Sequence, residues 1–255
     1  MRALITIMLL ATTAIAAPQR AFVDMWRAAK QEPAEGIIPE DLGVPALYLD
    51  FSVGSSVLES RAPDVTATNN AFVSHILSLV GTNVAVQTTG VRKSRYITSA
   101  INGQNALLFD GSDLYVMPNL TGTNITQLFV FTRATNNTFS IGAYGSASYP
   151  FWWYSDRFIY AARGSGSLTA QTNWSTGLFY ASTHMGSTNI IMLNKTQRHT
   201  TGTTSGSPTF NNIGGPVGQS HVGYMACIIV WTNYIDPLLV NQLVDEWAIP
   251  KWGTP

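Results

Sequence analysis

Short runs in which apolar and polar residues alternate, separated by Gly, Asn, Ser and Pro, fill most of the chain after residue 45. Alternation with a period of two is typical of β-strands that bury one face, and helical patterns are rare between these runs. The clearest runs lie at residues 46–51, 105–109, 127–133, 139–143, 157–162, 177–182, 188–193 and 221–231. Many short strands at this spacing predict an all-β sandwich, or jelly roll.

A few segments repeat their apolar residues at helical spacing instead. Residues 22–30 predict a short amphipathic helix, and residues 71–79 predict another in the middle of the chain. Near the C-terminal end, Asp236 is placed to cap a helix, Pro237 to occupy its first position and Pro250 to stop it. The apolar stripe of this last helix comprises Leu239, Val240, Leu243, Val244 and Trp247.

The first residues have the pattern of a secretory signal peptide. Met1 and Arg2 form a positive start, an apolar run follows, and a small-residue stretch (14–17) precedes Pro18. The apolar stretch of about 15 residues is shorter than the roughly 20 that span a bilayer, so we expect no stable membrane span. The alternative is an apolar arm that docks on a partner subunit. We therefore divide the chain into a signal peptide or apolar arm (1–17), a short helix and linker (18–44) and a β-sandwich (45–255).

Three motifs, taken in order, resemble one protein family. Residues 45–50, Pro-Ala-Leu-Tyr-Leu-Asp, are similar to its opening strand, and residues 101–116, which contain Phe-Asp-Gly, to a hairpin. Residues 225–253, ending in Lys-Trp-Gly, are similar to its closing strand and helix. The family is the LamG-like domain of the concanavalin A-like lectin/glucanase superfamily, found in bacterial surface proteins and phage virion proteins. The resemblance implies a concanavalin A-like jelly roll of two packed antiparallel sheets, with the terminal helix closing one end.

The second motif predicts a hairpin whose tight turn is Asp110-Gly111, where glycine can take a positive φ. Apolar residues alternate with solvent-facing ones before the turn, in residues 107–109, and again after it, from Leu114 to Val116. Asp110 and Asp113 offer the hard oxygen ligands that Ca²⁺ prefers, but Ca²⁺ takes six or more oxygens and the turn has two carboxylates. We therefore expect these aspartates to stabilise the turn, and we expect no cofactor.

Charged residues make up only 11% of the 255 residues, and fourteen Lys and Arg balance fourteen Asp and Glu. Nucleic-acid binding relies on clustered positive charge, so this composition argues against a DNA or RNA partner. The single cysteine, Cys227, lies in an apolar run, and the four histidines stand apart in the sequence. We therefore expect neither a disulfide within the chain nor a metal site.

Glycoside hydrolysis is the enzyme hypothesis to test, because many concanavalin A-like sandwiches are glycosidases. That chemistry needs two carboxylates about 5–10 Å apart, and the enzyme branches of the fold carry them at alternate positions of one strand. The glutamates form no such row and lie in the linker, a predicted loop and the terminal helix, at Glu32, Glu35, Glu40, Glu59 and Glu246. We expect a non-enzymatic protein. The alternative is a glycosidase with an atypical pair of carboxylates drawn from Asp50, Asp64, Asp110 and Asp156.

Four consecutive aromatic residues, Phe151 to Tyr154, precede Asp156 and Arg157. Sugar rings stack their C–H faces on aromatic side chains, while Asp and Arg hydrogen-bond the hydroxyls. Alternate side chains of a strand face opposite sides, so about half of this aromatic row belongs to the core, in either of two registers. The predicted ligand-binding residues are Trp152, Trp153, Tyr154, Asp156, Arg157 and, as a second candidate, Trp174.

These observations favour a non-enzymatic, extracellular or cell-surface β-sandwich that binds a glycan or polysaccharide through exposed aromatic residues. The alternative is a structural virion protein, such as a capsid decoration, spike or fibre subunit. Sheet faces rich in hydroxyl and amide groups can pack against identical neighbours without the desolvation cost of ion pairs. This second hypothesis predicts a homo-oligomer.

Overall fold

The computed structural model describes residues 36–61, 63–133, 139–142, 151–154, 158–163, 166–171, 177–186, 188–202, 209–214 and 221–255. The predicted signal peptide or arm at residues 1–17 and the predicted helix at residues 22–30 lie outside the described residues. No helix within these ranges is both long enough and apolar enough to cross a bilayer.

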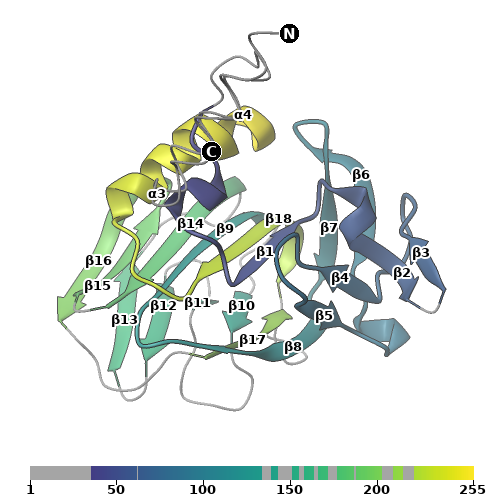
Figure 1. Ribbon diagram of the computed structural model, residues 1–255, viewed down its shortest axis with the longest axis horizontal. Helices are drawn as coiled ribbons and strands as arrows, with labels where there is room; N and C mark the ends of the chain where they lie inside the picture. The colour runs from purple at the N-terminus through teal and green to yellow at the C-terminus, as the bar shows by residue number, and fades with distance from the viewer. Residues whose placement is uncertain are drawn as a thin grey trace, which may run out of the picture.

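Two antiparallel sheets make up the molecule (Figure 1). Sheet A has the order β16-β15-β14-β9-β18-β7-β6, with β1 beside β18. Its strands are β1 (Leu47–Asp50), β6 (Arg95–Ile101), β7 (Gln104–Asp110), β9 (Ile125–Arg133), β14 (Gly177–Met185), β15 (Thr188–Leu193), β16 (Thr196–Gly202) and β18 (Val222–Trp231).

Sheet B has the order β13-β12-β11-β10-β17-β8-β5-β4-β2-β3. Its strands are β2 (Val57–Arg61), β3 (Asp64–Thr66), β4 (His75–Leu77), β5 (Val84–Val86), β8 (Leu114–Thr121), β10 (Phe139–Gly142), β11 (Phe151–Tyr154), β12 (Phe158–Arg163), β13 (Gly166–Gln171) and β17 (Thr209–Gly214). Short 3-10 turns lie at η1 (Pro39–Leu42), η2 (Gly54–Ser56) and η3 (Gly90–Arg92). Each of the eight predicted runs coincides with a strand, so the predicted all-β sandwich is confirmed.

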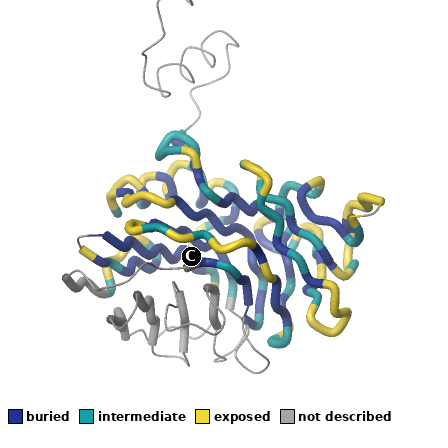
Figure 2. Tube along the Cα trace, turned by 60° about the horizontal axis from the view of Figure 1, so that its bottom comes forward, coloured by how far each residue is buried: buried dark blue, intermediate teal, exposed yellow. Residues whose placement is uncertain are grey.

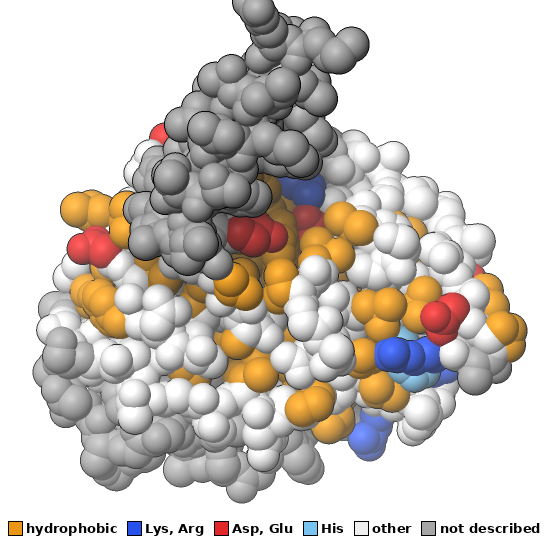
Figure 3. Space-filling view, viewed as in Figure 1, with side chains coloured by type: hydrophobic (Ala, Val, Ile, Leu, Met, Phe, Trp, Pro, Cys, Tyr) orange, Lys and Arg blue, Asp and Glu red, His pale blue; other side chains and the backbone are white. Residues whose placement is uncertain are grey.

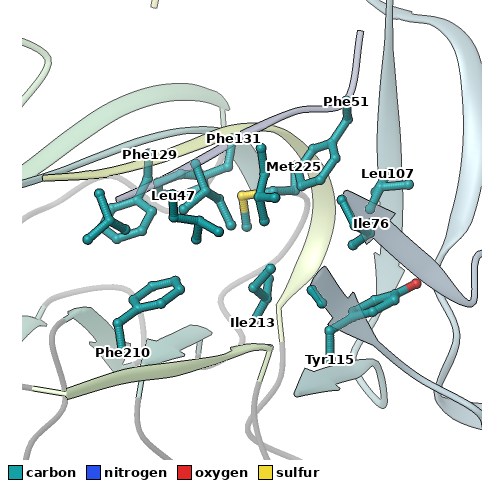
Figure 4. Close-up of a cluster of buried hydrophobic side chains, with 14 of the residues drawn as sticks. Leu47, Phe51, Ile76, Leu107, Tyr115, Phe129, Phe131, Phe210, Ile213 and Met225 are labelled. Carbon is teal, nitrogen blue, oxygen red and sulfur yellow. The ribbon is translucent and has the colours of Figure 1, made fainter. Parts of the chain in front are cut away.

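The main core lies between the two sheets. Aromatic and aliphatic side chains meet there, including Leu47, Phe129, Phe131 and Met225 from sheet A and Tyr115, Phe210 and Ile213 from sheet B (Figure 4). Full burial of such a side chain contributes about 1.5–3 kcal/mol. The buried positions follow the strands, and many of the exposed ones lie in the turns (Figure 2). The alternation seen in the sequence is therefore the alternation between core and surface.

A second core lies on the outer face of sheet A, beneath the terminal helix. Val130, Ile229 and Trp231 from the sheet are buried in the same cluster as Leu243 and Trp252 from the helix. Because sheet A is covered on both faces, the central part of β18 is apolar without interruption, and its whole stretch from Met225 to Trp231 is buried.

The terminal helix begins as predicted but continues past the expected stop. Asp236 Oδ1 accepts a hydrogen bond from the Leu238 N–H at 2.8 Å, which confirms the N-cap. The helix then runs from α3 (Pro237–Leu243) through a π-helical turn, η4 (Val244–Ala248), into α4 (Ile249–Trp252). The prediction that Pro250 stops the helix is therefore wrong. Proline lacks an N–H, and the π-helical turn just before it changes the hydrogen-bond spacing where that donor is missing.

The predicted helix at residues 71–79 is also wrong, because this segment is extended and contains β4. Its backbone bonds go to neighbouring segments, for example from Val73 N to Ser94 O at 3.0 Å and from Ser74 N to Leu58 O at 2.9 Å. Ile76 is buried, whereas Phe72 and Leu79 are exposed. The helical pattern rested on only a few apolar residues. Hydrogen bonds to neighbouring segments therefore determine the conformation of this segment.

The predicted hairpin at Asp110-Gly111 is wrong in its pairing. β7 belongs to sheet A and pairs with β6 and β18, whereas β8 belongs to sheet B and pairs with β5 and β17. The turn between them therefore carries the chain from one sheet to the other. Val116, expected to face the core, is exposed, because Tyr115 is the residue that points inward. Gly111 does take a positive φ, of 99°.

A buried ion pair joins the first strand to the terminal helix. Lys251 Nζ donates to Asp50 Oδ2 at 2.5 Å. Asp50 Oδ1 accepts from both the N–H and the hydroxyl of Ser52, at 3.0 and 2.6 Å. The ammonium also lies over the rings of Trp247 and Trp252, at 5.6 and 4.8 Å from their centroids. The first and last motifs of the sequence thus meet across this contact.

Candidate ligand-binding site

A cavity of about 550 Å³ opens at the edge of sheet A, where the chain crosses to sheet B. This volume lies in the range typical of small-molecule sites. The lining side chains come from the segment before β4, the η3 turn, β6, β7 and the crossover turn: Phe72, Gly90, Val91, Lys93, Arg95, Leu108, Asp110 and Asp113. Aromatic, aliphatic, cationic and acidic groups therefore share one cavity.

Phe72 and Arg95 form one wall of the cavity. They pair through an isolated antiparallel bridge, which brings the segment before β4 alongside the edge strand β6. The Arg95 guanidinium lies over the Phe72 ring, 4.7 Å from its centroid, and its Nη1 donates to Asn70 Oδ1 at 3.0 Å. Phe72 is 48% exposed, which is unusual for a large aromatic side chain. This wall presents a ring and a planar cation to solvent.

The crossover turn forms the floor. The N–H and hydroxyl of Ser112 lie 2.9 and 2.7 Å from Asp110 Oδ1, and the same hydroxyl lies 3.0 Å from the Val91 carbonyl. The Asp110 N–H donates to Asp113 Oδ2 at 2.9 Å. These contacts confirm that both aspartates stabilise the turn.

Asp113 is buried with an incomplete set of partners. It is 1% exposed, and its Oδ1 accepts no hydrogen bond. Burial raises the pKa of Asp113 to about 7; the hydrogen bond from Asp110 N opposes this rise, and the charge of Asp110 adds to it. The Asp113 backbone is packed so closely against Gly214 that a Cβ there would come within 2.1 Å of the Asp113 carbonyl oxygen.

The described residues provide no ready metal site. Nowhere among them do three or more His, Cys, Asp or Glu side chains gather as ligands. In the crossover turn, Asp110 and Asp113 already use one oxygen each for the turn. His184 is enclosed between Ser182 Oγ and the Ile235 carbonyl, each at 2.8 Å, and burial lowers its pKa to about 4.

The carboxylates considered for catalysis are dispersed. Asp50 is held by Lys251, and Asp64 lies on the exposed strand β3. Glu59 lies in β2 and not in the predicted loop, where its Oε1 accepts from Thr68. Asp156 lies outside the described residues. Among the described carboxylates, Asp110 and Asp113 share the cavity, and the free oxygen of Asp113 is enclosed and out of reach of a substrate.

The predicted aromatic row is part of sheet B. Trp152 pairs with Ser140 on one side and Tyr160 on the other, and Trp153 pairs with Phe139 and Ile159. Tyr154 ends the same strand, β11. The other three predicted ligand-binding residues, Asp156, Arg157 and Trp174, lie outside the described residues.

Sequence reasoning missed most of the cavity. Phe72 was assigned to a helix that does not form, and Lys93 and Arg95 were not singled out. Two cations two residues apart, Lys93 just before β6 and Arg95 at its first position, are the signal that the sequence offers. Asp110 and Asp113 were recognised, but in a hairpin and not in a crossover.

No family model and no curated protein matches the sequence. Solved structures do resemble the fold. Trypanosoma rangeli sialidase in complex with sialic acid matches with a TM-score of 0.53 and 10% identity, over 90% of this chain and 39% of that one. The same sialidase in complex with the inhibitor DANA matches with a TM-score of 0.52 and 11% identity, over 88% of this chain and 38% of that one. Domain 4 of the arabinanase AbnA from Geobacillus stearothermophilus, in complex with arabinotriose, matches with a TM-score of 0.46 and 14% identity. The match covers 78% of this chain and 97% of that one.

These likenesses concern the fold alone. The chain spans about two fifths of the length of the sialidase that it matches. It shares with part of that protein a β-sandwich fold, which is the coarse form of the predicted resemblance. The narrower LamG-like assignment stays a prediction.

Proposed function

We propose that the protein is a non-enzymatic β-sandwich module that binds a glycan, with the cavity at the edge of sheet A as its binding site. The main observation behind this proposal is that one cavity of about 550 Å³ is lined by a half-exposed aromatic ring, two cations and a carboxylate. These belong to Phe72, Lys93, Arg95 and Asp110.

The lining suits a sugar because it has both an apolar and a polar side. Phe72, Val91 and Leu108 offer surface to the C–H face of a pyranose ring. Lys93 and Arg95 donate hydrogen bonds to hydroxyl oxygens, and Asp110 accepts from hydroxyl groups. In support, the sialidase that shares the fold was solved with sialic acid.

The aromatic row of β11 remains a second element of the proposal. Trp152, Trp153 and Tyr154 would extend the binding surface on sheet B, with Asp156 and Arg157 as hydrogen-bonding partners and Trp174 as a further stacking residue. The row is separate in sequence from the cavity, so substitutions can test the two independently.

Binding to a glycan array and to immobilised polysaccharides tests the proposal. We expect Phe72→Ala to weaken binding by about tenfold or more, because the ring supplies the stacking surface. Leu79→Ala is the matched control, since Leu79 is a similarly exposed apolar residue outside the cavity. A double Trp152→Ala and Trp153→Ala variant measures the aromatic row. Clean negatives for the unmodified protein across broad arrays would overturn the function itself.

The absence of catalysis is part of the proposal. A glycosidase acid must reach the glycosidic oxygen, but Asp113 Oδ2 is held by the turn and Oδ1 is enclosed. We expect no hydrolysis of oligosaccharides that the protein binds, measured by product chromatography over days. Turnover that Asp110→Asn or Asp113→Asn abolishes would reverse this assignment.

Display outside the cell is also proposed, and the mass of the mature protein tests removal of residues 1–17. The structural virion subunit remains the alternative. It predicts a stable homo-oligomer, so light scattering that finds a monodisperse monomer would count against it.

A further inference from the structure

We infer that the cavity selects an anionic sugar, one that carries a carboxylate or a sulfate, over its neutral counterpart. This inference rests on the proposed glycan-binding function and adds the class of ligand. It follows from which charged groups of the cavity are already engaged with the protein and which are not.

The two cations have no acidic partner in the described part of the chain. Among the described residues, the ion pairs are Lys195 with Asp245 and Lys251 with Asp50, and neither involves the cavity. The Lys93 ammonium makes no hydrogen bond or ion pair within the described part of the chain, although the Lys93 backbone N–H donates to the Gly90 carbonyl at 3.3 Å. Among the described residues, the Arg95 guanidinium contacts two neutral groups, the Asn70 amide and the Phe72 ring, and keeps further donors for a ligand.

The two carboxylates, in contrast, are both bonded to the crossover turn, Asp110 through one oxygen while it stays exposed, and Asp113 while it is buried. Asp110 Oδ1 is occupied by the N–H and hydroxyl of Ser112. Asp113 Oδ2 is occupied by the Asp110 N–H, and its Oδ1 is enclosed. Burial also raises the pKa of Asp113 to about 7, so below that pH this carboxyl is mainly neutral. A ligand therefore meets two cations, Lys93 and Arg95, against the one exposed carboxylate of Asp110.

The positive region continues beyond the cavity. Burial lowers the pKa of His75 most; the charges of Arg61 and Lys93 lower it further and that of Asp64 opposes them, so these groups lie near one another. Basic, acidic and histidine side chains gather over β2–β4 on the face shown in Figure 3, while the rest of that face carries few charges. Against so sparsely charged a surface, the two basic side chains of this cluster, Arg61 and Lys93, would attract an anion towards the cavity.

The ligand's geometry follows from the lining. Its ring would lie against Phe72 and Val91, and its acidic group would meet Lys93 and Arg95. Arg binds carboxylate and sulfate oxygens through two parallel N–H donors, which adds orientation to attraction. A neutral sugar gains the ring contact but leaves both cations without a counter-charge.

Matched pairs of ligands test the inference by isothermal titration. The pairs are sialyllactose with lactose, a hexuronate oligosaccharide with its carboxyl-reduced form, and a sulfated galactan oligosaccharide with its desulfated form. We expect the acidic member of at least one pair to bind about tenfold more tightly or better at low salt, and this preference to shrink as salt rises. The first two pairs and the third separate carboxylate from sulfate recognition.

Variants assign the preference to the cavity. Lys93→Gln and Arg95→Gln should each weaken binding of the acidic member several-fold more than binding of the neutral member, because both members lose a hydrogen-bond donor but only the acidic member loses a counter-charge. Lys195→Gln is the matched control, because that lysine pairs with Asp245 away from the cavity. Circular dichroism and the melting temperature establish that each variant is folded, and charge-reversed Lys93→Glu provides a second variant with a larger expected loss.

The outcomes separate the inference from the function beneath it. Equal binding of acidic and neutral members, with Phe72→Ala still weakening both, would overturn the anion preference and leave glycan binding intact. A preference that survives the Lys93 and Arg95 substitutions would place anion recognition elsewhere and overturn the inference. Binding of no member of any pair would remove both proposals.

Discussion

Asp50 and Asp113 are each 1% exposed, yet their surroundings are opposite. Asp50 is fully engaged: Lys251 contacts one oxygen, and the N–H and hydroxyl of Ser52 contact the other. Asp113 has one hydrogen-bonded oxygen and one enclosed oxygen without a donor. The first lies under the terminal helix, and the second lines an open cavity.

The difference distinguishes a structural contact from a candidate site. A buried charge is costly unless it is paired, and most buried polar atoms in folded proteins have a partner. Asp50 meets this requirement within the chain, so it needs nothing from outside. Asp113 does not, and its neutral form is the one that burial favours. Within the described residues, the cations beside Asp113 have no acidic partner, and they, not its enclosed oxygen, mark the cavity as the place where a ligand would bind.

Removing the partner of Asp50 should have the largest effect. Lys251→Met leaves a buried carboxylate without its cation, and we expect a loss of about 3 kcal/mol in the free energy of unfolding. Urea unfolding followed by tryptophan fluorescence measures this loss.

Lys195→Met is the matched control for that substitution. Its ion pair with Asp245 is exposed on both sides, so its loss should cost less than about 1 kcal/mol. Adding Asp50→Asn to Lys251→Met should recover part of the stability, because the uncompensated charge disappears. If both lysine variants lose the same free energy of unfolding, the buried ion pair stabilises the protein no more than the exposed one.

Replacing Asp113 should raise the free energy of unfolding at neutral pH, whereas Lys251→Met lowers it. Because burial raises the pKa of Asp113 to about 7, the folded state holds this proton more tightly than the unfolded state does. Stability should therefore fall as pH rises from about 4 to 7 and level off above that. Asp113→Asn cannot titrate, so it should be more stable than the unmodified protein by about 1–3 kcal/mol at pH 8.

The measurement is the difference in unfolding free energy between the two proteins, from pH 4 to pH 8. The charged or titratable groups around Asp113 are Asp110, Tyr115, Lys93 and Arg95, and all of them are present in both proteins. Their contributions largely cancel in the difference. Parallel pH profiles would mean that Asp113 titrates alike in the folded and unfolded states.

The fold was accessible from the sequence because its signals are local. Strand alternation, the Asp236 cap and the apolar stretch that ends at Trp231 each follow from neighbouring residues, and the structure confirms them. Where few residues set the pattern, prediction failed. The segment 71–79 satisfied a helical period by chance, and the turn at Asp110 gave no sign that its two strands belong to different sheets.

The candidate site was largely inaccessible because it is assembled by tertiary contacts. Arg95 lies opposite Leu108 in the pairing of β6 with β7, and Phe72 joins through a single bridge. No spacing of residues in the sequence predicts these tertiary contacts. The Asp50 and Lys251 pair is similar: both residues belong to recognised motifs, but their contact spans 201 positions.

The smallest expected effect compares two serines in the same local arrangement. Ser52 and Ser112 each lie two residues after an aspartate and direct both N–H and hydroxyl to its Oδ1. The Asp50 acceptor is buried and the Asp110 acceptor is exposed, so water can replace only the second hydroxyl. We expect Ser52→Ala to lower the free energy of unfolding by about 1.5 kcal/mol and Ser112→Ala by about 0.5 kcal/mol. If thermal unfolding ranks the two variants the other way, the turn beside the cavity, and not the contact under the helix, is the more tightly constrained of the two.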